Sequence, residues 1–433
     1  MDKKWYDNEI SMGIMKRKYL HKGESPEDFI LRVASIFSDK LKPYALEVLN
    51  NADFLPAGRT LFGAGFKGVL KLSLSNCYIL PTMTDTIESI FDTAKMLARI
   101  SSYGGGSGLS IDNLRPKGAP VNNSALTSTG VVSFLNIFDV TGSTIGQNGR
   151  RAAIMVGLRC DHPDIEEFLK IKQNDEKLSS MNISIKFTDE FIKAVEDNKN
   201  FTLYFDSPET GRIEKVINVK DFFMEFCETQ LDYGEPGAIF IDRVRSYKTL
   251  SGYPEYRIDI SNPCAEFFGT GGNSCNLGSI NVYNVIDNKF TGNACVNYSK
   301  LSYITDIAVK MLDEVLDYGR DMQPLELNKQ IIDDWRSIGL GIFGLTDAFV
   351  ALGVKYGSPK SCEKVRSIMK EILKQAIITS SKLAKEKGSF GKFDIEKTLK
   401  SPIIQLLPEL HEFIKDNGLR HGTLLSIAPT GTI

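Results

Sequence analysis

Short apolar runs alternate with amphipathic segments over most of this chain. From about residue 73, the pattern predicts strands at 76–80, 108–111, 152–157, 182–186, 238–242, 277–282, 338–343 and 423–427. It predicts helices at 86–100, 163–172, 189–198, 219–231, 303–319 and 362–387. Because strands that alternate with helices pair in parallel, the pattern predicts an α/β fold, and eight such strands suit a barrel or a large doubly wound sheet.

The first part of the chain has a different pattern. Between residues 25 and 41, apolar residues recur at helical spacing with polar residues opposite. Ser25 suits the N-cap of such a helix, and Pro26 suits its first position. We therefore divide the chain into an N-terminal helical region, 1–72, and an α/β region, 73–433.

Composition and charge narrow the class of protein. The chain has 433 residues, of which 42% are hydrophobic, as in an ordinary globular protein. Lys and Arg number 52 against 54 Asp and Glu, a balance that argues against a nucleic-acid-coating protein. The charged N-terminus is unlike a signal peptide, and no stretch has the length of apolar residues that a membrane span needs. We therefore expect a cytoplasmic protein with no membrane and no nucleic-acid partner.

The cysteines point to chemistry and not to a disulfide framework. There are seven, an odd number spread over a long chain. The four histidines are not paired at ligand spacing and there is no CxxC motif, so we expect no metal site.

The most informative stretch is Asn262-Pro263-Cys264-Ala265-Glu266, which a Gly-rich segment and Cys275 follow. In an extended segment, an amide, a thiol and a carboxylate at alternating positions would project from one side. A lone cysteine is most often a core residue. The full pattern favours a reactive site, because polar groups are seldom buried without purpose.

Five motifs in order resemble the ribonucleotide reductase family. They are Ser-Asn-Cys-Tyr-Ile-Leu at 75–80, Ser-Tyr-Gly-Gly-Gly-Ser-Gly-Leu at 102–109, Gln-Asn-Gly-Arg-Arg at 147–151, the stretch around Cys264, and Ser-Ile-Ala-Pro-Thr-Gly-Thr at 426–432. The resemblance covers nearly the whole chain. It implies a ten-stranded α/β barrel, built from two antiparallel halves of parallel strands, around a central finger loop at about 260–275.

The resemblance also implies an activity, the reduction of ribonucleotides, in the diphosphate form, to 2'-deoxyribonucleotides. Cys264 would become a thiyl radical that removes the 3'-hydrogen, and Glu266 would be the general base on the 3'-hydroxyl. Asn262 would hold the ribose hydroxyls. Cys77 and Cys275 would supply two electrons and end as a disulfide.

Substrate and effector positions follow from the same resemblance. The expected substrate-binding residues are Asn76, Gly105, Gly106, Pro429, Thr430, Gly431 and Thr432. The expected effector-binding residues, for dNTP or ATP, are Asp85, Arg115, Gln147 and Arg151. Simpler roles stay open for some of these residues. The segment 429–432 could be a loop without a ligand, Asp85 could be a helix N-cap, and Arg115 could be a solvated side chain.

The resemblance implies partners as well. We expect a homodimer and a reductant of the thioredoxin or glutaredoxin type. The chain ends directly after the phosphate loop, so we expect a further polypeptide to complete the last barrel strands; an intervening element, such as an intron or intein, that separates the two halves is the alternative. Cys264 and Cys275 lie eleven positions apart, which resembles the adenosylcobalamin-dependent class; a separate metal-containing radical subunit is the alternative.

Two other functions are compatible with parts of the pattern. A nucleotide-binding regulatory homologue without catalysis would not need the five residues Cys77, Asn262, Cys264, Glu266 and Cys275 together. An unrelated α/β enzyme with a nucleophilic cysteine would need a paired histidine, which the sequence does not offer.

Overall fold

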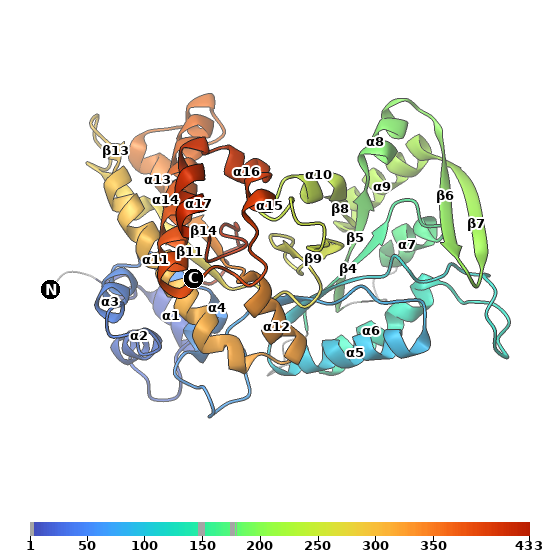
Figure 1. The fold of residues 1–433 in the computed structure, drawn as a ribbon, viewed down its shortest axis with the longest axis horizontal. Coiled ribbons are helices and arrows are strands. Elements are labelled where there is room, and N and C mark those ends of the chain that lie inside the picture. The colour runs from blue at the N-terminus through green and yellow to red at the C-terminus, as the bar shows by residue number, and fades with distance from the viewer. Residues whose placement is uncertain (1–3, 146–151, 174–177, 179) are drawn as a thin grey trace. The chain divides into compact units, whose positions relative to one another are not determined.

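The structure is a computed structural model that describes residues 4–145, 152–173, 178 and 180–433. Backbone contacts divide the chain into two compact units, which are described separately. The first unit consists of Met1–Asn76 and Ser274–Ile433, and the second of Cys77–Asn273. Figure 1 labels elements of both units where there is room.

A five-stranded, fully parallel sheet forms the centre of the second unit (Figure 1). In spatial order its strands are β2 (Cys77–Ile79), β3 (Gly106–Ser110), β4 (Ile154–Arg159), β5 (Met181–Phe187) and β8 (Gly237–Phe240). All four neighbouring pairs are parallel. Five predicted strands are thereby confirmed, and the α/β class with them.

Helices connect these strands, as parallel pairing requires. They are α5 (Ile87–Ser102), α6 (Val131–Thr144), α7 (Ile165–Lys170), η1 (Ile171–Gln173), α8 (Asp189–Glu196) and α9 (Val219–Tyr233). A further helix, α10 (Ile241–Ser246), follows β8. The predictions at 86–100, 163–172, 189–198 and 219–231 are confirmed. We did not predict α6, whose valines, threonines, serines and glycine have low helix propensity.

The second unit also carries an antiparallel hairpin that we did not predict. It consists of β6 (Asn200–Ser207) and β7 (Gly211–Asn218), paired along their full length. Most of β7 is exposed, with Arg212, Glu214 and Lys215 among its residues. These charges interrupt the apolar pattern from which strands are predicted.

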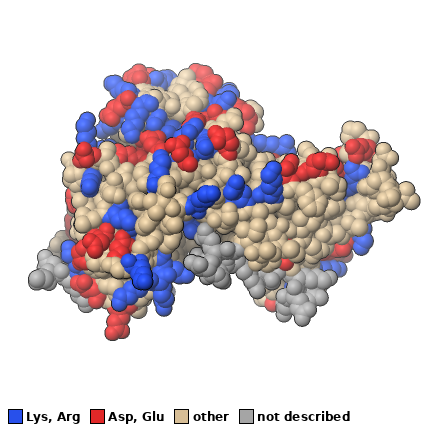
Figure 2. Space-filling model, turned by 90° about the horizontal axis from the view of Figure 1, so that it is seen from below, with Lys and Arg blue, Asp and Glu red and all other residues tan. Residues whose placement is uncertain are grey.

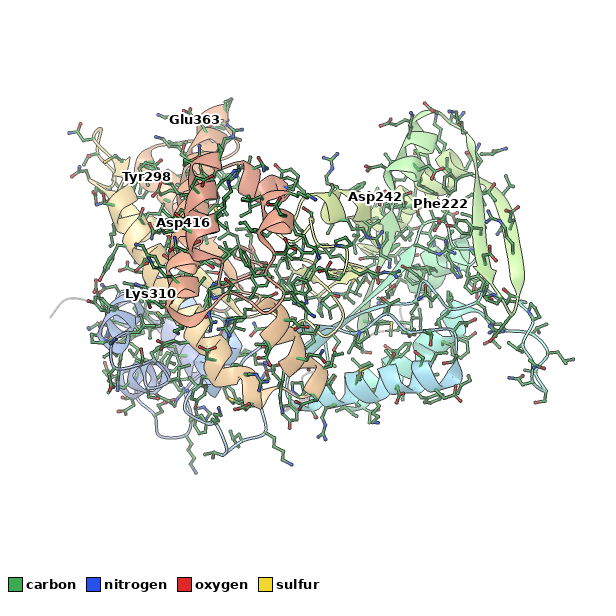
Figure 3. The ribbon with its side chains drawn as sticks, viewed as in Figure 1. Phe222, Asp242, Tyr298, Lys310, Glu363 and Asp416 are labelled. Carbon is green, nitrogen blue, oxygen red and sulfur yellow. The ribbon has the colours of Figure 1, made fainter. Side chains whose placement is uncertain are left out.

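An aromatic cluster packs α8 and α9 against β5. The buried ring of Phe187 lies 5.5 Å from Phe191 and 5.2 Å from Phe226, between ring centres. Phe222, labelled on α9 in Figure 3, lies 5.9 Å from Phe191. Large buried rings contribute much of the apolar area that stabilises such an interface.

The first unit contains a three-stranded mixed sheet. Its strands are β1 (Phe54–Pro56), β11 (Leu277–Asn281) and β14 (Gly339–Phe343), in that spatial order. β1 pairs antiparallel and β14 parallel with β11. The predicted strands 277–282 and 338–343 are confirmed. Within 1–72 the prediction of helix alone is incomplete, because β1 joins this sheet.

The predicted strand 423–427 is present only as a bridge. Leu425 pairs with Leu340 of β14 in parallel, and the Ser426 N–H donates to the Leu340 carbonyl at 3.1 Å. A methyl group on Gly341 would come within 2.5 Å of the Ser426 carbonyl oxygen, so this glycine permits the close approach. The segment therefore follows β14 towards residues 429–432.

Helices make up most of the first unit. They are α1 (Glu9–Lys18), α2 (Pro26–Ala34), α3 (Lys42–Asn50), α4 (Gly58–Gly63), α11 (Tyr298–Gly319), α12 (Glu326–Trp335), α13 (Leu345–Leu352), α14 (Pro359–Lys387), α15 (Ile395–Leu399), α16 (Pro402–Gln405) and α17 (His411–Asn417). Short elements are η2 (Val282–Val285), η3 (Arg320–Met322), η4 (Pro408–Leu410), and β12 (Ile286–Asp287) paired with β13 (Cys295–Val296).

The predicted helix at 25–41 is shorter than expected. α2 begins as predicted, with Ser25 as N-cap in a capping box and Pro26 at the first position, but it ends at Ala34. The apolar residues beyond it, such as Phe37, are buried without continuing the helix. The predicted helices 303–319 and 362–387 are confirmed within α11 and α14.

A buried charge cluster holds the helical part of this unit together. The fully buried carboxylate of Asp313 on α11 accepts from Arg336 at 2.6 Å, Lys387 at 2.8 Å and Arg420 at 3.1 Å. His421 donates to it at 3.2 Å. These interactions tie α11 to the ends of α12 and α14 and to the segment before Leu425.

No described helix is both long and apolar enough to cross a membrane. On the face in Figure 2, described acidic and basic side chains are interspersed with uncharged surface, and no continuous basic tract is visible. This distribution agrees with the formal net charge of -2.

Candidate active site

The residues around Cys264 form a tight turn. The turn joins β9 (Ile260–Ser261) and β10 (Phe268–Gly269), which pair antiparallel. The Ala265 N–H donates to the Asn262 carbonyl at 3.0 Å, and Ala265 has a φ of 63°. Our expectation of an extended segment is therefore wrong: the left-handed residue reverses the chain, so side-chain alternation does not apply.

Asn262 closes this turn from both sides. Its N–H donates to the Phe267 carbonyl at 3.0 Å, and its Oδ1 accepts from the Phe267 N–H at 3.1 Å. Asn262 is fully buried, whereas Cys264 at the tip is exposed. The amide therefore has a structural role in presenting the thiol, beside any contact with a ligand.

Glu266 is the titratable carboxyl of the turn. Burial raises its pKa above the ordinary value, and the side chain of Asn262 partly offsets this effect. A carboxyl with a raised pKa is closer to the range in which a general base works. The turn thus combines an exposed thiol, a buried amide and a partly buried carboxyl.

Glycines in the sheet make room for this turn. A methyl group on Gly108 would lie 1.8 Å from the Ser261 carbonyl oxygen, and one on Gly106 would lie 3.0 Å from Pro263. On β4, a methyl group on Gly157 would lie 2.3 Å from the Ile260 side chain. The turn therefore rests directly on the backbones of β3 and β4.

The predicted substrate-binding glycines face protein atoms. The Cβ position of Gly105 lies 2.5 Å from the ring of Tyr78, and that of Gly106 lies 3.0 Å from the Ala153 carbonyl oxygen. In this structure the space beside these glycines is filled by the protein itself. Their role towards a substrate stays a prediction.

Two lysines beside the turn were missed in the sequence. Lys186 of β5 is 2% exposed, and its Nζ donates to the Asp259 carbonyl at 2.8 Å. The Nζ of Lys248 donates to the Phe268 carbonyl, and burial lowers the pKa of Lys248 to about 7. The available signal for Lys186 was a charged residue inside the predicted strand 182–186.

The other cysteines differ in their surroundings. Cys77 on β2 is buried in the second unit, and Cys275 is buried in the first. Cys160 is also buried, which raises its pKa to about 12, so its thiol is a poor nucleophile. The remaining three, Cys227, Cys295 and Cys362, are exposed.

The predicted phosphate loop has a constrained backbone. Thr430 has a φ of 51°, which places a non-glycine residue in the left-handed region. The hydroxyls of Thr432 and Tyr19 lie 2.5 Å apart, so the N-terminal helical region contacts this loop. The Asn76 Oδ1 accepts from the Arg59 N–H at 3.2 Å.

The predicted effector residues Asp85 and Arg115 form an ion pair. The Arg115 Nε donates to Asp85 at 2.6 Å, and its other end pairs with Glu209 at 2.5 Å. Arg115 is therefore not a solvated side chain. Thr86, and not Asp85, is the N-cap of α5, because its hydroxyl accepts from the Ser89 N–H. Gln147 and Arg151 lie outside the described residues.

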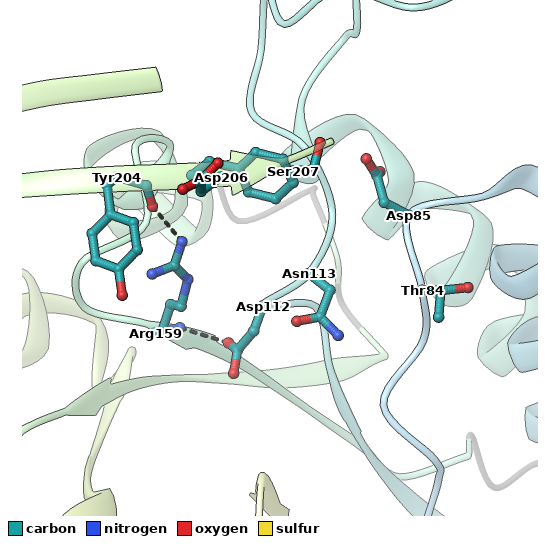
Figure 4. Close-up of a pocket in the computed structure, with 9 residues that line it drawn as sticks. Thr84, Asp85, Asp112, Asn113, Arg159, Tyr204, Asp206 and Ser207 are labelled. Carbon is teal, nitrogen blue, oxygen red and sulfur yellow. Dashed lines mark hydrogen bonds between the residues drawn. The ribbon is translucent and has the colours of Figure 1, made fainter. Parts of the chain in front are cut away.

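A cavity of about 490 Å³ opens beside this ion pair (Figure 4). It is lined by Thr84, Asp85, Asp112, Asn113, Arg159, Tyr204, Phe205, Asp206 and Ser207. Arg159 donates through its side chain to the Tyr204 carbonyl and through its N–H to Asp112 at 2.8 Å. Its guanidinium also pairs with Asp161 at 2.9 Å. The charged residues of the lining are three aspartates and one arginine.

Within the described residues, no group of three or more His, Cys, Asp or Glu side chains could hold a metal ion. The chemistry that the described residues offer is that of the thiol, the carboxyl and the amide of the turn.

Comparison with known proteins identifies the family. The family model described as "Ribonucleotide reductase, barrel domain" matches residues 75–433. The vitamin B12-dependent ribonucleoside-diphosphate reductase of Mycobacterium tuberculosis (strain CDC 1551 / Oshkosh) is 33% identical over 388 residues, which are 89% of this chain and 52% of that protein.

Further relatives agree. The protein of the same name from Thermoplasma acidophilum is 34% identical, over 89% of this chain and 47% of its own length. The ribonucleoside-diphosphate reductase large chain of Neurospora crassa is 28% identical, over 96% of this chain and 49% of its own length. The chain spans about half the length of the curated relatives it matches. The predicted family and its barrel fold are confirmed, and the chain belongs to the ribonucleotide reductases through their barrel domain.

Proposed function

We propose that the intact protein reduces ribonucleoside diphosphates to 2'-deoxyribonucleotides by radical chemistry at Cys264. The observation that carries this proposal is the turn 262–267, where an exposed thiol lies between a buried amide and a carboxyl whose pKa burial raises. A thiol that must meet a radical source needs this accessibility. A carboxyl that must accept a proton benefits from the raised pKa.

In the proposed reaction, the Cys264 sulfur radical takes the hydrogen atom from C3' of the ribose, while Glu266 accepts the proton of the 3'-hydroxyl. The 2'-hydroxyl then leaves as water with a proton from Cys77 or Cys275. The second thiol supplies the hydrogen that C2' gains, and the two thiols together supply two electrons and end as a disulfide. Glu266 gives its proton back to the 3'-oxygen, and Cys264 returns its hydrogen atom to C3', which regenerates the sulfur radical.

Substrate-binding roles are proposed for residues in the turn and for residues that precede and follow it in the sequence. Asn262 would bind the ribose hydroxyls, and Asn76, Gly105 and Gly106 would line the substrate. The backbone N–H groups of Thr430, Gly431 and Thr432 and the threonine hydroxyls suit a phosphate group. The left-handed backbone of Thr430 supports this role, because such strain is typical of ligand-binding loops.

The radical source is proposed to be adenosylcobalamin. The short spacing between Cys264 and Cys275 favours it, and two of the relatives above are named vitamin B12-dependent. When bound, this cofactor would supply a carbon radical able to take a hydrogen atom from a thiol. The exposed tip of the turn fits a reactant that reaches the Cys264 sulfur from outside. A separate metal-containing subunit acting on the same thiol is the alternative.

Effector binding and dimerisation are proposed as well. Asp85 and Arg115, with Gln147 and Arg151, would bind a dNTP or ATP effector; the cavity beside Asp85 supports a ligand there. A homodimer is supported by apolar side chains more than half exposed on α5 and α6, namely Ile87, Phe91 and Val140. A reductant of the thioredoxin or glutaredoxin type would restore the dithiol.

The test is a product assay on the intact protein. A ribonucleoside diphosphate, a dithiol and adenosylcobalamin are added, and deoxynucleotide is measured by mass spectrometry, with cofactor-free samples alongside. We expect cofactor-dependent product from the unaltered protein and from Cys362→Ser, whose exposed thiol lies on α14, but not from Cys264→Ser. Nucleotide binding without any product would instead favour a regulatory homologue.

A further inference from the structure

The turn that carries Cys264 has little support from its own strands. β9 and β10 pair over two residues each, Phe268 with Ser261 and Gly269 with Ile260. An isolated two-stranded hairpin is marginally stable in water even when it is longer than this. Other contacts must therefore fix the position of the turn on the sheet.

Lys186 contacts the point where the chain enters the turn. Its Nζ donates to the Asp259 carbonyl at 2.8 Å and to the Ser110 hydroxyl at 2.9 Å, and it pairs with the carboxylate of Asp112. The side chain passes the Cα of Gly157, since a methyl group there would lie 3.4 Å from its Cδ and Cε. A buried ammonium is tolerated only when such acceptors surround it.

The entry side has a second set of contacts. The carboxylate of Asp259 accepts from the Thr82 hydroxyl at 2.7 Å and from Arg245 at 3.1 Å. The backbone carbonyl of Asp259 accepts from Lys186. Asp259 is therefore held both at its carboxylate and at its carbonyl. Asp259 lies directly before β9, and its position sets where the turn begins.

Lys248 contacts the point where the chain leaves the turn. Its Nζ donates to the Phe268 carbonyl, the first residue of β10. The same nitrogen lies 5.6 Å from the ring centre of Phe267 and 5.3 Å from that of Phe268. The carbonyl acceptor and the two rings around this nitrogen restrain both the backbone and the side chains of this segment.

We propose that Lys186 and Lys248 are positioning residues that clamp the two ends of the turn and thereby fix the Cys264 thiol. The inference rests on the proposed function, because the thiol needs a fixed position only if it exchanges a hydrogen atom with a bound ribose. A displacement of about 1 Å at such a site is enough to slow a reaction roughly 100-fold. Neither lysine touches the reacting atoms in this account.

The test compares three methionine variants of the intact protein, which replace a lysine by an apolar side chain of similar length. Lys186→Met and Lys248→Met each remove one clamp. The matched control is Lys172→Met: the Lys172 Nζ also donates to backbone carbonyls, of Leu178 at 2.8 Å and Met181 at 2.6 Å, but at the other end of β5.

Hydrogen–deuterium exchange of peptides that cover 260–269 is the readout that does not depend on activity. We expect amide exchange in this segment to become roughly tenfold faster in each clamp variant and to stay unchanged in the control. In the product assay we expect kcat to fall roughly 100-fold at nearly constant KM. A role in stability alone would spread the change in exchange over the whole second unit.

The outcomes separate the clamp from the proposed function. Faster exchange confined to 260–269 in a protein without reductase activity supports the clamp and contradicts the proposed function. Unchanged exchange and unchanged kcat in both variants of an active protein overturn the clamp. If Lys186→Met fails to fold because Asp112 is left unpaired, the double variant with Asp112→Asn removes that buried charge and is measured instead.

Discussion

Glu266 combines a cost in stability with a proposed chemical role, since burial raises the pKa of its carboxyl. A folded-state pKa above the unfolded value means that the folded protein loses stability as the pH rises from the unfolded pKa through the folded one. Glu266→Gln should therefore raise the thermal midpoint at pH 7. The same change should lower kcat by about 100-fold or more, because it removes the proposed base.

The pH dependence tests the same residue. If Glu266 must be ionised, kcat of the unaltered protein falls as the pH decreases through its raised pKa, and this acid limb is absent from whatever activity Glu266→Gln retains. Thermal melts and pH profiles of both proteins are the measurements. Glu228→Gln, at an exposed position of α9, is the control and should change neither the thermal midpoint nor the pH profile. A variant with full activity would remove Glu266 from the mechanism.

At the scale of residues, the sequence predicted which chemical groups meet but not how they are held. The pattern around Cys264 pointed to a thiol, an amide and a carboxyl in one small region, and the turn brings them there. The left-handed conformation of Ala265 has no sequence signal, because alanine rarely adopts it. The pairing of Arg115 with Asp85 joins positions thirty residues apart, which periodicity does not report.

At the scale of elements, the approach of β9 to β3 depends on Gly108. A methyl group at this position would lie 1.8 Å from the Ser261 carbonyl oxygen, which no side-chain rotation can relieve. Gly108→Ala should therefore displace the turn, lower the free energy of unfolding by about 1–3 kcal/mol or more, and abolish turnover. Chemical denaturation and the product assay measure the two effects.

The control for that change is Gly292→Ala, where the added methyl group meets open space. Its effect on the free energy of unfolding should stay within about 0.5 kcal/mol. Equal stability of the two variants would mean that β9 does not rest on β3 as described.

Asp313 should be the most sensitive acidic position in the first unit. Its neighbours hold its pKa far below the ordinary value despite burial, and Arg336, Lys387 and His421 all contact it. Asp313→Asn leaves buried cations without their counterion and should lower the free energy of unfolding by about 3–5 kcal/mol. Asp317 is partly exposed and pairs with the same cations. Asp317→Asn should lower the free energy of unfolding by about 1 kcal/mol or less.

The sign of the pH dependence follows from the lowered pKa. The contribution of Asp313 is fully present above the unfolded pKa of an aspartate and is lost as the pH falls towards the folded value. The stability difference between the unaltered protein and Asp313→Asn should therefore be largest near neutral pH and shrink in acid. Denaturation at a series of pH values checks this, and a difference that grows in acid would contradict it.

Which elements were predictable depended on their burial. Four of the five parallel strands of the second unit are buried along almost their whole length, and all five were found from their pattern. The β6–β7 hairpin was missed because its exposed strand carries charges, and β1 was missed because it is short and lies among helices. The segment 423–427 has a strand's composition but forms only a bridge, since pairing depends on neighbours that periodicity does not describe.

At the scale of the whole molecule, the proposed electron donors come from different units, Cys77 from the second and Cys275 from the first. After one turnover without external reductant, we expect a disulfide between these two and free thiols at the other five positions. Peptide mapping with differential alkylation measures this. A disulfide that involves Cys160, Cys227, Cys295 or Cys362 would show that the donors are misassigned.

The central claim is that a sulfur radical at Cys264 takes the hydrogen atom from C3' and later returns it. The most direct measurement uses a ribonucleoside diphosphate with deuterium at C3' in the intact protein with adenosylcobalamin and a dithiol. We predict slower turnover than with the unlabelled substrate, and a deoxynucleotide that keeps its deuterium at C3'. Product that forms at the same rate for both substrates, or that carries solvent hydrogen at C3', would contradict the account.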